Sequence, residues 1–186
     1  MYRIFQGALA LALLANSLVL EAQQTAAPQA EAIRVSSPPV LDGILDDDAW
    51  SLGQSITDFV QREPNEGTPV SEATEVKLLY DDNALYVGAW MYDEDAANIV
   101  LGETRRDAPL QQTDAFVVVL DTYRDGQNAF VFGTTPAGIE YDGQVANEGQ
   151  RGGGGGGPGT RRQQSGSGGG FNLNWDGSWE VRTSRN

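Results

Sequence analysis

The sequence predicts an all-β domain of the β-sandwich class, jelly-roll or immunoglobulin-like in type. Apolar and polar residues alternate in several short segments, which is the period of a half-buried strand. Turn signals such as Asp-Gly at 42–43, 125–126 and 176–177 separate these segments. No segment has the pattern of a long helix. Many short strands divided by turns are typical of sandwiches and jelly rolls.

The clearest strands form a hairpin around the turn at 81–83. Before it, apolar residues alternate up to Tyr80, and after it Leu85, Val87, Ala89 and Met91 alternate with a second set. The run 115–120 is continuously apolar, so we expect it to be buried on both faces. In chain order, the expected strands are 32–35, 56–61, 76–80, 85–92, 115–120, 129–134, 139–145 and 179–183.

The segment 38–50 contains the most specific local pattern. Asp42 and Gly43 predict a tight turn, and we expect Asp46 to cap a short turn or helix that carries Trp50. Because large aromatic side chains are mostly buried, Trp50 is interpreted as a wedge in the core rather than a sugar platform.

The start of the chain predicts export. Arg3 precedes a stretch of mostly Ala and Leu that ends near the small residue Ala22, which is typical of a signal peptide over 1–22. Residues 23–32 are then a polar leader and 33–186 the domain. We expect a periplasmic, outer-membrane-associated or extracellular location.

Composition excludes several kinds of site. The chain has neither His nor Cys, so it lacks the usual general base, the usual transition-metal ligands and any disulfide. Its net charge of −14 makes nucleic acid an unsuitable partner, because phosphate backbones would be repelled. No motif for a catalytic residue is present, so we expect no catalysis by this chain itself.

Residues 151–170 are rich in glycine and predict a disordered insert. They do not form a phosphate-binding loop, because no Gly-Lys-Ser/Thr sequence ends the run. The strand expected at 179–183 lies so close to the last residue that we expect a C-terminally truncated domain, a fragment of a longer protein.

Two kinds of candidate site remain. Aspartates cluster at 46–48, 81–82 and 93–95. Oxygen ligands of this type suit calcium, although such clusters are more often solvated turns. Tyr86, Trp90 and Tyr92 alternate along one strand, so their rings point to one face. That face is either an aromatic second layer of the core or a platform for a sugar.

The blocks 38–50, 74–95, 113–143 and 175–183, in this order, resemble the family 9 carbohydrate-binding modules. The resemblance implies a β-sandwich that binds the ends of sugar chains, with structural calcium, in a protein of polysaccharide catabolism such as a hydrolase of O-glycosyl compounds. The nearest branch occurs at the N-terminus of large secreted proteins, where an outer-membrane-type barrel often follows.

The chain departs from the sugar-binding members at three places. Leu110, Gln111 and Gln112 stand where those members have a tryptophan, Val117 replaces an acid, and Gly133 replaces an arginine. Two hypotheses therefore stay open. The chain is an exported module that binds polysaccharide or oligosaccharide through Tyr86, Trp90 and Tyr92, or it is a structural or docking domain in front of a barrel in the same polypeptide.

Overall fold

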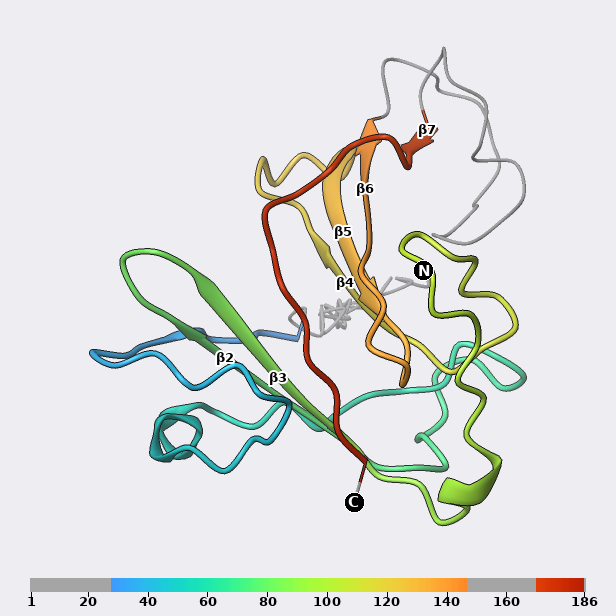
Figure 1. Cartoon of the computed structure of the whole chain (residues 1–186), viewed down its shortest axis with the longest axis horizontal. Helices are drawn as coiled ribbons and strands as arrows, with labels where there is room; N and C mark the ends of the chain where they lie inside the picture. Colours follow the sequence, from blue (N-terminus) through green and yellow to red (C-terminus); the bar gives the residue numbers. More distant parts are fainter. Residues whose placement is uncertain (1–27, 147–169, 186) are drawn as a thin grey trace, which may run out of the picture.

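The computed structural model describes residues 28–146 and 170–185, and in these ranges the chain is nearly all strands (Figure 1). Seven strands form two sheets, and helix is limited to two short 3-10 turns, η1 and η2, so the all-β prediction is confirmed. None of the helices described is long and apolar enough to cross a bilayer. The expected signal peptide, the first part of the leader and the glycine-rich insert up to residue 169 lie outside the described residues.

The first sheet has three strands in the order β1-β2-β3. They are β1 (Ile33–Arg34), β2 (Thr74–Tyr80) and β3 (Leu85–Met91). β1 runs parallel to β2, while β2 and β3 form the predicted hairpin, with Tyr80 opposite Leu85 at its end. The turn forms where expected because the Asp81 carboxylate accepts hydrogen bonds from the backbone N–H groups of Asn83 and Ala84, at 2.7 and 2.9 Å.

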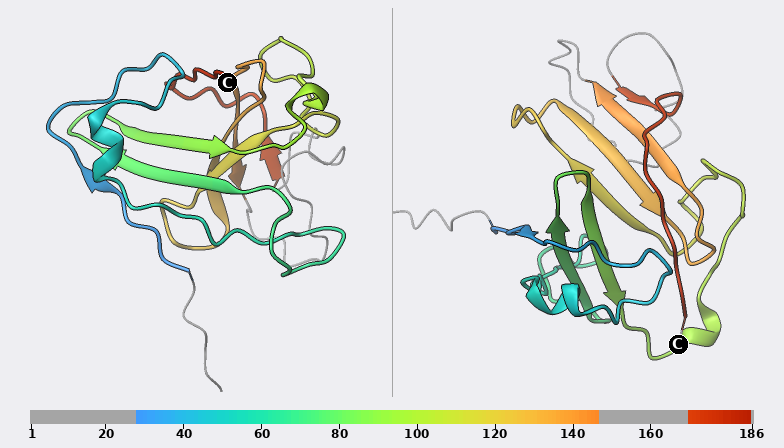
Figure 2. Two further views of the ribbon diagram at one scale, coloured as in Figure 1. Left: turned by 90° about the horizontal axis from the view of Figure 1, so that it is seen from below. Right: turned by 60° about the vertical axis from the view of Figure 1, so that its left-hand side comes forward.

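The second sheet has four antiparallel strands in the order β4-β5-β6-β7. They are β4 (Phe116–Leu120), β5 (Asn128–Thr134), β6 (Tyr141–Ala146) and β7 (Gly170–Asn172). Figure 2 shows that the β2–β3 hairpin runs crosswise to the strands of this sheet. η2 (Ala96–Asn98) lies in the long connection between the two sheets.

Trp50 anchors the core of the three-stranded sheet. It is carried by η1 (Asp48–Leu52) and lies in one cluster with Val35 and Leu79, so its predicted role in the core is confirmed. The cap prediction was wrong: the N-cap position is Asp47, not Asp46, and no side chain caps the helix there. The Asp47 carboxylate instead accepts a hydrogen bond from the backbone N–H of Val40, at 3.1 Å.

A second cluster lies against the four-stranded sheet. Val131, Tyr141 and Phe171 are its buried members, and the Tyr141 and Phe171 rings stack with centroids 5.9 Å apart. Gly143 is required in mid-strand, because a Cβ there would lie 2.4 Å from the Phe171 ring. The Asp-Gly dipeptide at 142–143 therefore lies within β6 rather than in a turn.

Two strand predictions were wrong. β4 is not buried on both faces: Val117 and Val119, which point to one face, are 36% and 52% exposed. Continuous apolar sequence predicted burial, but it does not reveal whether both faces of a strand are covered. β4 is also the edge strand of its sheet. Residues 179–183 are extended without forming a strand, since they have no ladder partner among the described residues, and β7 precedes them unpredicted.

The expected strand at 56–61 is reduced to two isolated bridges. Ile56 pairs with Val76, and Val60 pairs with Pro69. Proline has no N–H to donate, so a longer ladder cannot continue through Pro69. The segment therefore borders β2 without joining the sheet as a strand.

Gly88→Ala should destabilise the domain by about 1–3 kcal/mol, as overpacking of a filled core does. The added Cβ would lie 2.8 Å from the Trp50 ring, and an indole held in the core has no room to move. Chemical denaturation checks this. Gly170→Ala is the matched control, because its Cβ meets nothing within 4 Å. Equal stability of the two variants would contradict the packing described here.

Candidate functional site

The predicted aromatic row begins on the face of β3 that carries the Trp50 cluster. Tyr86 and Trp90 are half-buried and pack against this cluster. The rings of Trp90 and Trp50 meet edge to face, with centroids 6.1 Å apart and planes at 86°. On the same face, the Lys77 ammonium lies 5.5 Å from the centre of the Trp90 ring, in a cation–π contact.

Tyr92, the third residue of the row, lies just beyond β3. Its backbone N–H donates to the carbonyl of Ala73 at 2.9 Å, while its side chain is 54% exposed. Tyr86, by contrast, is held by a hydrogen bond from its hydroxyl to the Asp81 carboxylate, at 3.1 Å. The structure thus combines core packing at Tyr86 and Trp90 with an exposed ring at Tyr92. Whether the row binds a ligand stays a prediction.

Hydrogen-bonding groups surround Trp90. Glu75 lies directly opposite it in the ladder between β2 and β3, and the Glu75 carboxylate is 3.5 Å from the Lys77 ammonium. The Ser55 hydroxyl donates to Glu75 at 2.6 Å. This hydrogen bond is the main reason why the pKa of Glu75 is lowered below 4.5, and Lys77 lowers it further. A half-buried indole thereby lies close to a fixed carboxylate and a fixed ammonium.

The predicted aspartate clusters lie in three separate turns or loops, where most of their bonds are local, while Asp82 pairs with Arg34. The Asp81 carboxylate accepts the backbone N–H of Asn83 in the β2–β3 turn, and that of Asp93 accepts the N–H of Asp95 at 2.7 Å. The Asp47 carboxylate accepts the N–H of Val40. Nowhere in residues 28–146 and 170–185 are three or more acidic side chains placed to hold a metal ion. These carboxylates do not converge as calcium ligands must, so calcium stays a prediction without a located site.

Carboxylates do converge elsewhere, on Arg106. Its guanidinium bonds to Glu140, to Asp142 at 2.6 Å and to Asp176 at 2.5 Å, and Asp107 lies 3.7 Å from its Nε. We call these five residues the Arg106 network. Asp142 is only 1% exposed, whereas Asp176 is 79% exposed, so the network runs from the interior of the sheet to solvent.

Arg106 keeps its positive charge at any ordinary pH. Burial lowers the pKa of Arg106, but the surrounding carboxylates, Asp142 first, outweigh this and raise it above its usual range. No sequence signal could have identified this group, because Asp142 and Asp176 lie 36 and 70 residues from Arg106.

An aromatic group lies beside the Arg106 network on the same face of the four-stranded sheet. Residues 173–185, which we call the strap, follow β7. They begin with a turn at 173–174, and the rest crosses this sheet without forming a strand (dark red in Figure 1). Trp175 packs on Phe130 and Phe132, with ring centroids 4.8 and 5.8 Å away, and Trp179 packs on Phe132 at 5.3 Å.

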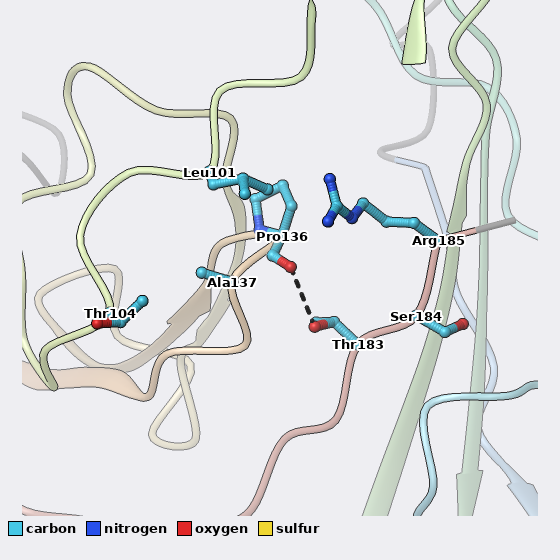
Figure 3. Close-up of a pocket in the computed structure, with 7 residues that line it drawn as sticks. All are labelled: Leu101, Thr104, Pro136, Ala137, Thr183, Ser184 and Arg185. Carbon is cyan, nitrogen blue, oxygen red and sulfur yellow. Dashed lines mark hydrogen bonds between the residues drawn. The ribbon is translucent and has the colours of Figure 1, made fainter. Parts of the chain in front are cut away.

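The far end of the strap borders an open hollow of about 610 Å³. Figure 3 shows Thr183 bonded to the carbonyl of Pro136, at 3.3 Å, with Arg185 extending toward the same residue. Leu101 and Thr104 line the opposite side. Hydroxyls and a guanidinium could orient a polar ligand here, but the lining holds no pair of groups suited to acid–base catalysis.

Comparison with protein families, with curated proteins and with solved structures finds no match for this chain.

Ser55→Ala should raise the pKa of Glu75 toward 4.5, because the hydroxyl that stabilises the carboxylate is removed. A lowered folded-state pKa stabilises the protein above the unfolded-state value, and this contribution is lost as the pH falls through the folded-state value. The wild type should therefore lose more stability than the variant on acidification below about pH 5. NMR titration of the side-chain carboxyl checks the shift, with exposed Glu72 as the reference. An unchanged Glu75 titration would contradict the assigned cause.

Proposed function

We propose that this chain is an exported, non-catalytic carbohydrate-binding module of a protein that acts in polysaccharide catabolism. The proposal rests first on the four-block resemblance to family 9 carbohydrate-binding modules. It also includes the sandwich interpretation of the fold, in which the two sheets form opposing layers. Their crosswise arrangement is compatible with an orthogonally packed sandwich.

The surroundings of Trp90 are the observation that carries the proposal. Sugar recognition combines an aromatic face, which packs against C–H groups, with polar groups that bond to hydroxyls. Trp90 is half-buried. The Glu75 carboxylate, an acceptor, lies opposite it in the ladder, and the Lys77 ammonium, a donor, lies over its ring at 5.5 Å. Tyr92 adds an exposed ring two residues further along the chain, which is one period of a strand.

The charge of the chain is consistent with a neutral ligand. A net charge of −14 repels anionic polymers, while uncharged sugar hydroxyls are unaffected. The carboxylate and ammonium beside Trp90 neutralise each other locally, at 3.5 Å. A neutral polysaccharide or oligosaccharide therefore suits this surface better than a sulfated or uronic one.

Retention of the purified chain on a panel of neutral polysaccharides tests this function. Trp90→Ala should abolish retention, and Tyr92→Ala should weaken it by about two- to tenfold, the loss expected for one aromatic contact. Tyr123→Ala is the matched control, because Tyr123 is another exposed tyrosine, on the β4–β5 connection. Its side chain is 69% exposed, and that of Tyr92 is 54% exposed.

Two outcomes of this assay would contradict the proposal. One is the absence of retention by the wild type on every polysaccharide. The other is an equal effect of Tyr92→Ala and Tyr123→Ala. Because Trp90 also contacts the Trp50 cluster, the Trp90→Ala result is interpreted only alongside an unfolding curve that shows a folded variant.

A structural calcium ion is the second part of the proposal, and it is supported by the resemblance alone. An ion that binds only the folded chain stabilises it by mass action, so excess chelator should lower the melting temperature by several degrees. Magnesium at matched ionic strength controls for a general effect of salt on an acidic chain. An unchanged melting temperature would exclude the calcium.

The alternative function, a structural or docking domain of an outer-membrane barrel protein, is favoured by the edge of the four-stranded sheet. β4 is unpaired on its outer side among the described residues, and it exposes Val117 and Val119. Such an edge readily takes up a strand from another segment.

Val119→Lys should prevent that pairing and leave retention on polysaccharide unchanged. This alternative would be favoured if the wild type binds no sugar but pairs with another segment through β4, and if Val119→Lys abolishes that pairing.

A further inference from the structure

The strap is attached to the rest of the domain in an unusual way for an extended segment. Its side chains alternate between half-buried and exposed over 173–181, as in a strand. Yet among the described residues no backbone-to-backbone hydrogen bond joins the strap to a neighbouring strand. The strap is therefore held by side chains and by a few bonds between side chains and backbone, and lacks the cooperative ladder that holds β5 to β6.

These contacts are concentrated at one point. The buried Asp142 carboxylate accepts the backbone N–H of Gly177 at 2.6 Å and also bonds to Arg106. Arg106 in turn bonds to Asp176 on the strap. Asp142 and Arg106 thus bond to two consecutive strap residues, Gly177 and Asp176, and we call this pair of contacts the grip. The chain also passes close to aromatic rings here, because a Cβ at Gly177 would clash with Trp175 and Phe132.

Beyond this point the attachments are weaker or more exposed. Thr183 donates to the carbonyl of Pro136 at 3.3 Å, and Ser184 donates to that of Gly43 at 2.6 Å. Beneath the strap lie the rings of Phe130 and Phe132, which Trp175 and Trp179 cover. Segments with few ladder bonds open at a lower free energy than the sheet below them.

We propose that the strap is a hinged cover that opens as a unit when the grip of Arg106 and Asp142 is released, while both sheets stay folded. Opening uncovers the aromatic surface of Phe130 and Phe132. It also removes one wall of the hollow, because Thr183, Ser184 and Arg185 belong to the strap. A ligand that fills the hollow therefore favours the closed strap, since it binds only that state.

Two indole groups provide the test. Trp179 and Trp50 both have a buried Nε1–H with no hydrogen-bond partner in the described structure. Their hydrogen exchange therefore depends on exposure to solvent, and only Trp179 lies on the strap. Exchange of the two indole N–H signals can be followed by NMR, with Trp179→Phe identifying the strap resonance.

The double variant Arg106→Gln/Asp142→Asn removes the ion pair without leaving a buried charge, and its asparagine can still accept the Gly177 N–H. It should accelerate Trp179 indole exchange at least about tenfold and leave Trp50 exchange unchanged. Asp176→Asn, at an exposed strap position, should accelerate Trp179 exchange by a smaller factor. Arg105→Gln is the matched control, because Arg105 pairs only with the nearby Glu103 among the described residues.

Two results would overturn the proposal. Equal acceleration at Trp179 and Trp50 in the double variant would mean that the domain opens only as a whole. Unchanged exchange at Trp179 in both the double variant and Asp176→Asn would mean that the Arg106 network does not hold the strap.

Discussion

The ion pair between Arg106 and Asp142 is the interaction on which the attachment of the strap to the four-stranded sheet depends. A carboxylate that is 1% exposed is unstable in a protein interior unless a cation and hydrogen-bond donors surround it. Arg106 supplies the cation, and the backbone of Gly177 supplies a donor. Arg106 lies in a loop, Asp142 in β6 and Gly177 in the strap. The interactions of one buried charge therefore fix the positions of three segments.

The two sheets are stabilised by separate sets of aromatic contacts. Trp50 packs on Trp90 in the three-stranded half, and Trp175 and Trp179 pack on phenylalanines of β5 in the other half. The contact of Ser184 with Gly43 links the end of the strap to the turn that precedes η1. The proposed sugar contact and the proposed cover lie on different sheets, and the hydrogen bond between Ser184 and Gly43 connects the two halves.

Local sequence predicted those features whose causes are local. The β2–β3 hairpin follows from strict alternation and from Asp81, and the turn at Asp42 forms because its carboxylate accepts the Ile44 N–H at 2.8 Å. The Arg106 network and the strap could not be predicted, since they join residues far apart in the chain. Alternation around Trp179 indicated an extended segment, but sequence does not show whether an extended segment has a partner to pair with.

The same distinction applies to the candidate site. Alternation correctly placed Tyr86 and Trp90 on one face, because strand period is a local property. Trp50 packs on this face in the space left by Gly88. This contact depends on the path of the chain between residues 50 and 88. The sequence allowed a core layer or a sugar platform on that face and favoured the core layer. The structure gives Tyr86 and Trp90 core contacts, while Tyr92 is exposed.

The most direct measurement of the central claim is an NMR titration of the uniformly labelled chain with soluble neutral oligosaccharides. If Trp90 contacts sugar, its indole signal and the backbone signals around Glu75 and Tyr92 should shift together in a saturable way. The indole signals of Trp175 and Trp179, on the other sheet, should stay in place. No saturable shift with any oligosaccharide, or shifts confined to the four-stranded sheet, would contradict the account.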